Sequence, residues 1–129
     1  MNEIELIKIA SDTNYYGLKK DCIKTAKVKN RICGDEIIIG INQKKSQIYY
    51  ETNACVLTQA TAAILANNFQ NLDKNNFKEY INKIKNFYKG KVELPNELDT
   101  INKILFGSNK NRKECIMLPF NAIEKIIND

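Results

Sequence analysis

The fold is decided by residues 35–52, which read DEIIIGINQKKSQIYYET. Residues 35–42 are rich in isoleucine, and residues 46–52 alternate apolar and polar side chains after a polar connection at 43–45. Isoleucine and tyrosine favour strands, and alternation with a period of two is typical of a strand with one buried face. Residues 23–30, just upstream, alternate in the same way. Together the three segments predict a small antiparallel meander.

Helical patterns flank this meander on both sides. Apolar residues recur at helical spacing before it, up to Gly17, and an alanine-rich segment follows it, alanine being the best helix former. Further helical patterns continue along the chain after the alanine-rich segment. We expect helices over residues 3–16, 58–69, 72–88, 98–106 and 115–127.

Length and composition favour one compact domain over residues 1–129. The chain has 129 residues, 43% of them hydrophobic, and contains no apolar stretch long enough to span a membrane. Glu3 and Glu5 stand where a secretion signal would carry basic residues. We therefore expect a cytoplasmic protein, in which the four cysteines serve metal, sulfur or redox chemistry rather than structural disulfides.

The net charge of +5 comes almost entirely from lysine, because Arg31 and Arg112 are the only arginines. Nucleic-acid-binding proteins usually concentrate arginine and aromatic residues on one surface, whereas these lysines are spread along the chain. Solubility and attraction of an acidic protein partner explain the charge better than binding of nucleic acid does. A basic nucleic-acid-binding domain or a purely structural zinc domain remains a third class of function.

Three cysteines stand at predicted boundaries of strands and helices. Cys33 and Asp35 are two residues apart where a strand begins, so an extended backbone would point both side chains to one face. Cys55 lies between the last strand and the alanine-rich helix, where the positive end of the helix dipole favours a thiolate. Cys115 precedes the final helix and follows Arg112 and other basic residues. Thiolates with a carboxylate suit an iron-sulfur cluster or zinc.

Spacing alone does not establish this site. Cys33 and Cys55 are 22 residues apart (55 − 33), and Cys55 and Cys115 are 60 apart (115 − 55), unlike a zinc finger or a ferredoxin. Burial of cysteine as a small apolar residue is the alternative for each position. The flanking residues decide between the two interpretations.

Those flanks resemble the NifU/IscU-type iron-sulfur cluster assembly scaffold family over nearly the whole chain. The resemblance rests on Cys-Gly-Asp at 33–35, on Ala-Cys at 54–55 followed by small and hydroxyl residues, and on Cys115 between Arg112 and Leu-Pro-Phe at 118–120. It implies an α+β fold, in which helices pack on one face of a three-stranded antiparallel sheet (IscU-like).

By this resemblance, Cys33, Cys55 and Cys115 are thiolate ligands and Asp35 is a further ligand or a gate for release. A scaffold of this kind builds a [2Fe-2S] cluster from iron and from sulfur supplied by a cysteine desulfurase, and passes it to apo iron-sulfur proteins. It is a carrier rather than an enzyme that turns over a small substrate. Carboxylate oxygen is a harder ligand than thiolate, so Asp35 would make the site leaky for a soft cluster.

Two departures from the family pattern argue against IscU-type histidine ligation and chaperone recognition, and one long stretch resembles the SufU-like branch of the SUF system. The IscU branch has a histidine before its third cysteine and a Leu-Pro-Pro-Val-Lys motif nearby, whereas here Glu114 takes that place, the motif is absent and the chain has no histidine. The long stretch between Cys55 and Cys115 resembles SufU-like proteins, which bind zinc and accept sulfur. The alternative function is thus a zinc-binding sulfur acceptor, with Cys115 as the candidate sulfur acceptor.

Cys22 lies outside the matched motifs. We expect it to be a packed or partly exposed thiol, with a role in relaying sulfur as the alternative.

Overall fold

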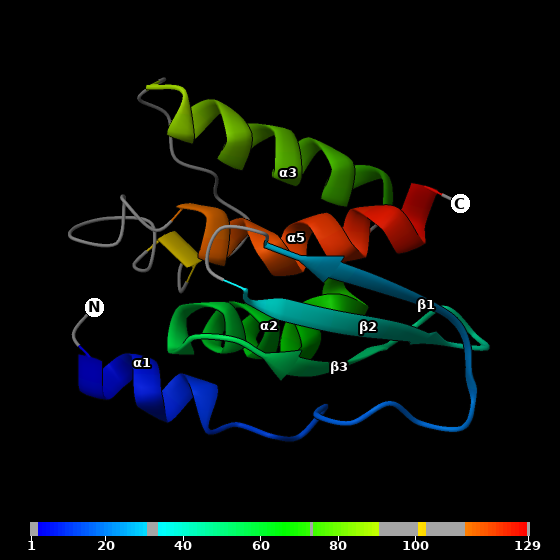
Figure 1. Ribbon diagram of the computed structural model, residues 1–129. Helices are drawn as coiled ribbons and strands as arrows, with labels where there is room; N and C mark the ends of the chain where they lie inside the picture. Colours follow the sequence, from blue (N-terminus) through cyan, green and yellow to red (C-terminus); the bar gives the residue numbers. More distant parts are fainter. Residues whose placement is uncertain (1–2, 31–33, 73, 91–100, 103–112, 129) are drawn as a thin grey trace.

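A three-stranded antiparallel sheet forms from one continuous meander, as the alternating segments predict (Figure 1). The computed structural model describes residues 3–30, 34–72, 74–90, 101–102 and 113–128. The strands follow each other in space in chain order and are β1 (Cys22–Lys29), β2 (Glu36–Asn42) and β3 (Ile48–Asn53). In the register, Ala26 pairs with Ile39, which in turn pairs with Tyr50.

The central strand places alternate residues, each an isoleucine, on the core side. Ile37, Ile39 and Ile41 are at most 2% exposed, because side chains two residues apart lie on the same face of a strand. The helices that enclose this core are α1 (Glu3–Ala10), α2 (Val56–Asn68), α3 (Lys74–Tyr88) and α5 (Lys113–Asn128), with a short 3₁₀ turn at Phe69–Asn71. Helices α2 and α5 contact the sheet, α1 packs on α2, and α3 packs on α5 (Figure 1). The α+β fold expected from the sequence is confirmed.

The first helix is shorter than predicted. It ends at Ala10 rather than at residue 16, because the next residues form turns: the backbone N–H of Asn14 donates to Asp12 Oδ1 at 3.1 Å. Tyr16 then forms a parallel bridge with Tyr50, and the two rings meet edge to face at 5.3 Å. The segment after α1 therefore runs beside β3 instead of continuing the helix.

The last helix is longer than predicted, since it begins at Lys113 rather than at residue 115. Cys115 consequently lies in the first turn of α5 and does not precede it. Of the helix expected over 98–106, only residues 101–102 fall within the described part, where they are helical. In the described part of the chain, no helix has both the length and the apolar character needed to cross a membrane.

Candidate metal centre

Three distant segments of the chain bring Asp35, Cys55 and Cys115 together. One ligand atom from each, a carboxylate oxygen and two sulfurs, lies within 4.8 Å of the others. Asp35 directly precedes β2, Cys55 is the N-cap residue of α2, and Cys115 is the third residue of α5. The fourth residue expected in the site, Cys33, lies outside the described residues.

Backbone conformation and backbone hydrogen bonds hold the main chain of Asp35 in place just before β2. Gly34 has a φ of +78°, a left-handed conformation that glycine adopts without strain. Backbone bonds close the loop on Asn30, whose N–H donates to the Asp35 carbonyl at 2.7 Å and whose carbonyl accepts the Gly34 N–H at 2.8 Å. The Cys-Gly-Asp motif therefore needs its glycine for local backbone reasons, before any metal is considered.

The Asp35 carboxylate also caps the N-terminus of α2. Cys55 has an extended backbone and its side chain makes no capping bond. Instead, the backbone N–H of Cys55 donates to Asp35 Oδ2 at 3.3 Å. An anion is favoured at this end of a helix by the dipole and the unpaired amides. The carboxylate is thus held beside the Cys55 sulfur by a contact that needs no metal.

Thr58 lies against all three residues. Its hydroxyl donates to the Cys115 carbonyl oxygen at 2.8 Å, and lies 3.5 Å from Asp35 Oδ2 and 3.6 Å from Cys55 Sγ. The Thr58 side chain is fully buried. In the sequence Thr58 stands out only as one of the hydroxyl residues after Cys55, which does not predict these contacts. The available signal was its three-residue offset, which places it on the same helix face as Cys55.

Exposure differs among the three candidate ligands. Cys115 is 5% exposed, whereas Asp35 and Cys55 are half-buried, so the group faces solvent on the side of Asp35 and Cys55. Glu114, which takes the position of the missing histidine, is exposed, as is Lys113. The basic residue Arg112 lies outside the described residues.

The donor set and spacing fit a thiophilic metal. Two sulfurs with one oxygen suit zinc or iron rather than magnesium or calcium. In a tetrahedral site with metal–sulfur bonds of about 2.3 Å, neighbouring ligand atoms are about 3.8 Å apart. The ligand atoms here, which lie within 4.8 Å of one another, are therefore at most about 1 Å farther apart than in an occupied tetrahedral site. Small side-chain movements would complete it.

Cys22 lies at the other end of the sheet. It pairs with Asn42 at the end of β2, whereas Asp35 precedes the start of that strand. Asn42 is six positions after Glu36 (42 − 36), which corresponds to roughly 20 Å along a strand. The Cys22 sulfur packs against Gly40, where an added Cβ would lie 2.8 Å from Sγ. This placement agrees with the expectation of a packed, partly exposed thiol.

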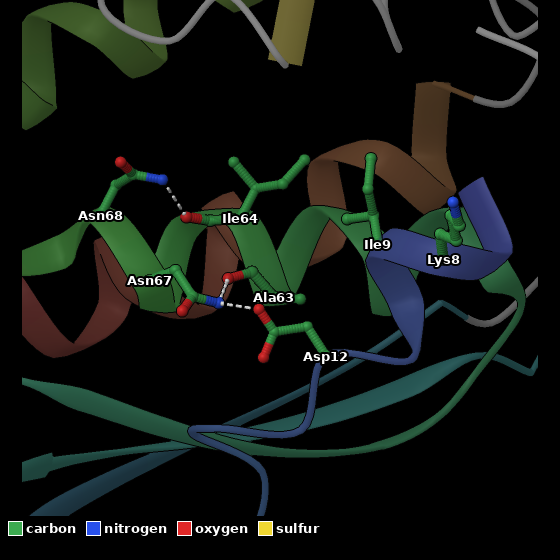
Figure 2. A pocket seen from close by; sticks show the side chains of 7 residues that line it. All are labelled: Lys8, Ile9, Asp12, Ala63, Ile64, Asn67 and Asn68. Atoms are coloured by element: carbon green, nitrogen blue, oxygen red, sulfur yellow. Dashed lines mark hydrogen bonds between the residues drawn. The ribbon is translucent and has the colours of Figure 1, made fainter. Parts of the chain in front are cut away.

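A hollow of about 310 Å³ lies elsewhere, between α1 and α2. Figure 2 shows that its amide groups are engaged with protein atoms. Asn67 Nδ2 donates to the Ala63 carbonyl at 2.7 Å and to Asp12 Oδ2 at 3.0 Å, and Asn68 Nδ2 donates to the Ile64 carbonyl at 2.8 Å. These amides are therefore less suited than the Asp35, Cys55 and Cys115 group to binding a ligand.

The sequence has low similarity to known proteins. No family model matches the sequence. A protein of Borreliella burgdorferi, described as uncharacterized, is 27% identical over 124 residues, which are 93% of this chain and 84% of that protein.

Two solved structures are similar over almost the whole chain. One is a candidate iron-sulfur cluster assembly scaffold protein for the SUF system, FiSufU, from Fervidobacterium islandicum, with a TM-score of 0.81, 23% identity and coverage of 97% of this chain and 94% of that one. The other is the N-terminal part of a NifU-like protein from Brucella abortus, with a TM-score of 0.82, 18% identity and coverage of 98% and 91%. The chain therefore has the fold that its resemblance to the NifU/IscU-type scaffold family, and to the SufU-like branch, implies.

Proposed function

We propose that this protein is an iron-sulfur cluster assembly scaffold that builds a [2Fe-2S] cluster on Cys33, Asp35, Cys55 and Cys115 and passes it to apo-proteins. The observation that carries the proposal is the convergence of Asp35, Cys55 and Cys115, from three separate segments, to within 4.8 Å. The likeness of fold to SufU and NifU-like structures supports it. The cluster is cargo, so a good scaffold must both hold and release it.

Asp35 is suited to the release step. A carboxylate oxygen is a hard ligand and binds a soft cluster more weakly than thiolate does. Asp35 is half-buried, and its oxygen is already shared with the backbone N–H of Cys55. It is therefore the ligand that exchanges most readily with an incoming acceptor group, while the buried Cys115 stays attached.

Sulfur enters from a cysteine desulfurase in this proposal. A cysteine thiolate of the scaffold attacks the outer sulfur of the desulfurase persulfide, a new S–S bond forms, and the desulfurase cysteine leaves as a thiolate. Cys115 is the acceptor expected from the sequence, and its basic neighbour Lys113 supports that choice. Exposure instead favours Cys55 as the thiol that meets the desulfurase persulfide first. Cys55 is half-buried, whereas Cys115 is only 5% exposed.

A zinc-binding sulfur acceptor is the second candidate. The compact spacing of the three ligand atoms favours it, because a single tetrahedral ion needs all its ligands within about 4 Å of one another. In this case Asp35, Cys55 and Cys115 would hold a zinc ion, and one of the two cysteines would leave it to take sulfur. In both cases we propose that the protein works with a cysteine desulfurase in the cytoplasm. We also propose that residues 1–129 form one domain.

Metal analysis of freshly purified protein and anaerobic reconstitution with iron and sulfide test the proposal. A scaffold gives a thiolate-to-iron charge-transfer spectrum, whereas an acceptor retains stoichiometric zinc that iron does not displace. Cys55→Ser should lose most of either metal, and Cys22→Ser, the matched control at the far end of the sheet, should bind as wild type does. Binding that survives Cys55→Ser but not Cys22→Ser would place the site elsewhere.

A further inference from the structure

A proline interrupts the hydrogen bonding of α5 next to the metal centre. Pro119 is the seventh residue of this helix, and in a regular helix its backbone N–H would donate to the carbonyl of residue 115. Proline has no N–H, so it cannot make that bond. The Cys115 carbonyl instead accepts the Thr58 hydroxyl of α2 at 2.8 Å.

The single proton of the Thr58 hydroxyl accounts for the direction of this link. The Cys115 carbonyl is the nearest of its three neighbours, at 2.8 Å, against 3.5 Å for Asp35 Oδ2 and 3.6 Å for Cys55 Sγ. A good O–H···O bond is about 2.7 to 2.8 Å long, so the carbonyl receives the proton. The hydroxyl oxygen is then left in contact with the other two candidate ligands.

We propose that Thr58 is a positioning residue of the metal centre, whose hydroxyl joins α2 to the first turn of α5 at the carbonyl that Pro119 cannot serve. The inference rests on the proposed function, since the link matters for metal only if Asp35, Cys55 and Cys115 bind one. The bond fixes the backbone of Cys115 relative to Cys55, three residues before Thr58 on the same helix. It thereby holds the two sulfurs close enough to share a metal.

Thr61 provides a matched control. It lies one turn further along α2 and is also fully buried, but its hydroxyl donates at 2.8 Å to the Leu57 carbonyl of the same helix. Thr58→Val and Thr61→Val each remove one buried hydroxyl and keep the side-chain shape. Only Thr58→Val removes a link between two helices that carry candidate ligands. Thr58→Ser keeps the hydroxyl and should rescue the site.

Anaerobic titration of the reduced protein with Co²⁺, followed by competition with Zn²⁺, gives metal affinity and a spectrum sensitive to coordination geometry. Partners behind metal ligands typically contribute 10- to 100-fold in affinity, so Thr58→Val should weaken binding by about 10-fold or more and shift the cobalt bands. Thr58→Ser and Thr61→Val should stay within about threefold of wild type, well below the 10- to 100-fold loss of affinity. Equal losses in Thr58→Val and Thr61→Val, or none in Thr58→Val, would overturn the inference.

Pro119→Ala tests the same link without metal. Alanine at 119 supplies the amide that the Cys115 carbonyl accepts in a regular helix, so Thr58→Val should lower the melting temperature less in the Pro119→Ala background than in wild type. If Thr58→Val alone does not fold, the metal titration is made in that background. Wild-type protein that binds no Co²⁺, Zn²⁺ or iron would refute the proposed function, whereas normal wild-type binding with an unaffected Thr58→Val would refute only the role of Thr58.

Discussion

Asp35→Ala should change stability and metal binding by separate routes, because the carboxylate both caps α2 and belongs to the candidate metal centre. Without metal, the variant loses the 3.3 Å bond from the Cys55 N–H and a negative charge at the helix N-terminus. Loss of an N-cap acceptor costs about 1 kcal/mol, within a range of about 0.5 to 2. For a domain of this size, that lowers the melting temperature by roughly 3 to 5 °C.

The effect on metal binding then separates the two candidate functions. If Asp35 completes a zinc site, its removal opens a coordination position and weakens zinc by at least the 10- to 100-fold typical of supporting residues. If Asp35 is the exchangeable ligand of a cluster, its removal slows transfer to an apo-acceptor and lengthens the cluster's half-life. Asp35→Asn is the matched variant, since it keeps an oxygen acceptor for the Cys55 amide but not the anionic ligand.

The assays are thermal unfolding of the metal-free protein, zinc competition, and cluster half-life, measured on wild type, Asp35→Ala and Asp35→Asn together. We expect the melting temperature of Asp35→Asn to lie between those of Asp35→Ala and wild type. Its zinc affinity and cluster half-life should match those of Asp35→Ala. A melting temperature unchanged in Asp35→Ala would refute the capping argument. Unchanged zinc affinity together with unchanged cluster half-life would remove Asp35 from the metal centre and leave the cysteines.

Three further predictions concern the thiols, the packing of Cys22 and the buried tyrosines. In variants that keep one cysteine at a time, an alkylating reagent should modify Cys55 faster than Cys115, which is 5% exposed; the reverse order would favour Cys115 as the first sulfur acceptor. Gly40→Ala should lower the free energy of unfolding, measured with denaturant, by about 1 to 3 kcal/mol, because the added Cβ would lie 2.8 Å from Cys22 Sγ. Cys22→Ala should relieve part of this cost. An equal cost of Gly40→Ala with Cys22 and with Ala at position 22 would show that the clash lies elsewhere. Burial, with a smaller contribution from Asp12, raises the pKa of Tyr50 from its ordinary value of 10.0 to about 12. This pKa is higher in the folded state than in the unfolded state. The free energy of unfolding is therefore unaffected by ionisation of Tyr50 below pH 10 and falls as the pH rises from 10 to 12, by up to about 2 to 3 kcal/mol. Burial also raises the pKa of Tyr88, so Tyr50→Phe should remove only part of the loss in this range, and identical pH profiles for wild type and Tyr50→Phe would contradict the argument.

The sheet was predictable from sequence because its signal is local. Alternation in each strand is set by burial of one face, and the isoleucines of β2 are buried where that pattern requires. The apolar pattern misplaces the end of α1 for an equally local reason. The run Ser-Asp-Thr-Asn at 11–14 favours turns, and the Asp12 side chain forms one, but the apolar periodicity before it outweighed that signal.

The candidate metal centre was predictable only in part. Asp35, Cys55 and Cys115 were singled out by their flanks, and the structure brings these three together, while Cys33 lies outside the described residues and stays a prediction. The apolar pattern of α5 begins at Cys115, two residues after the helix does, because Lys113 and Glu114 are charged. The role of Thr58 depends on a contact between residues 57 positions apart (115 − 58), which no local pattern encodes.

The wide separation of Asp35, Cys55 and Cys115 along the chain has a thermodynamic consequence. A metal held by all three would cross-link segments that unfolding pulls apart, so it would bind the native state far better than the denatured chain. At a free metal concentration 100 times the dissociation constant, this adds about 2.7 kcal/mol to the free energy of unfolding. If the protein is a scaffold, as proposed, it would be most stable when the metal is bound and would lose that stabilisation when it passes the metal on. The melting temperature would thus report the fraction of the protein that has metal bound.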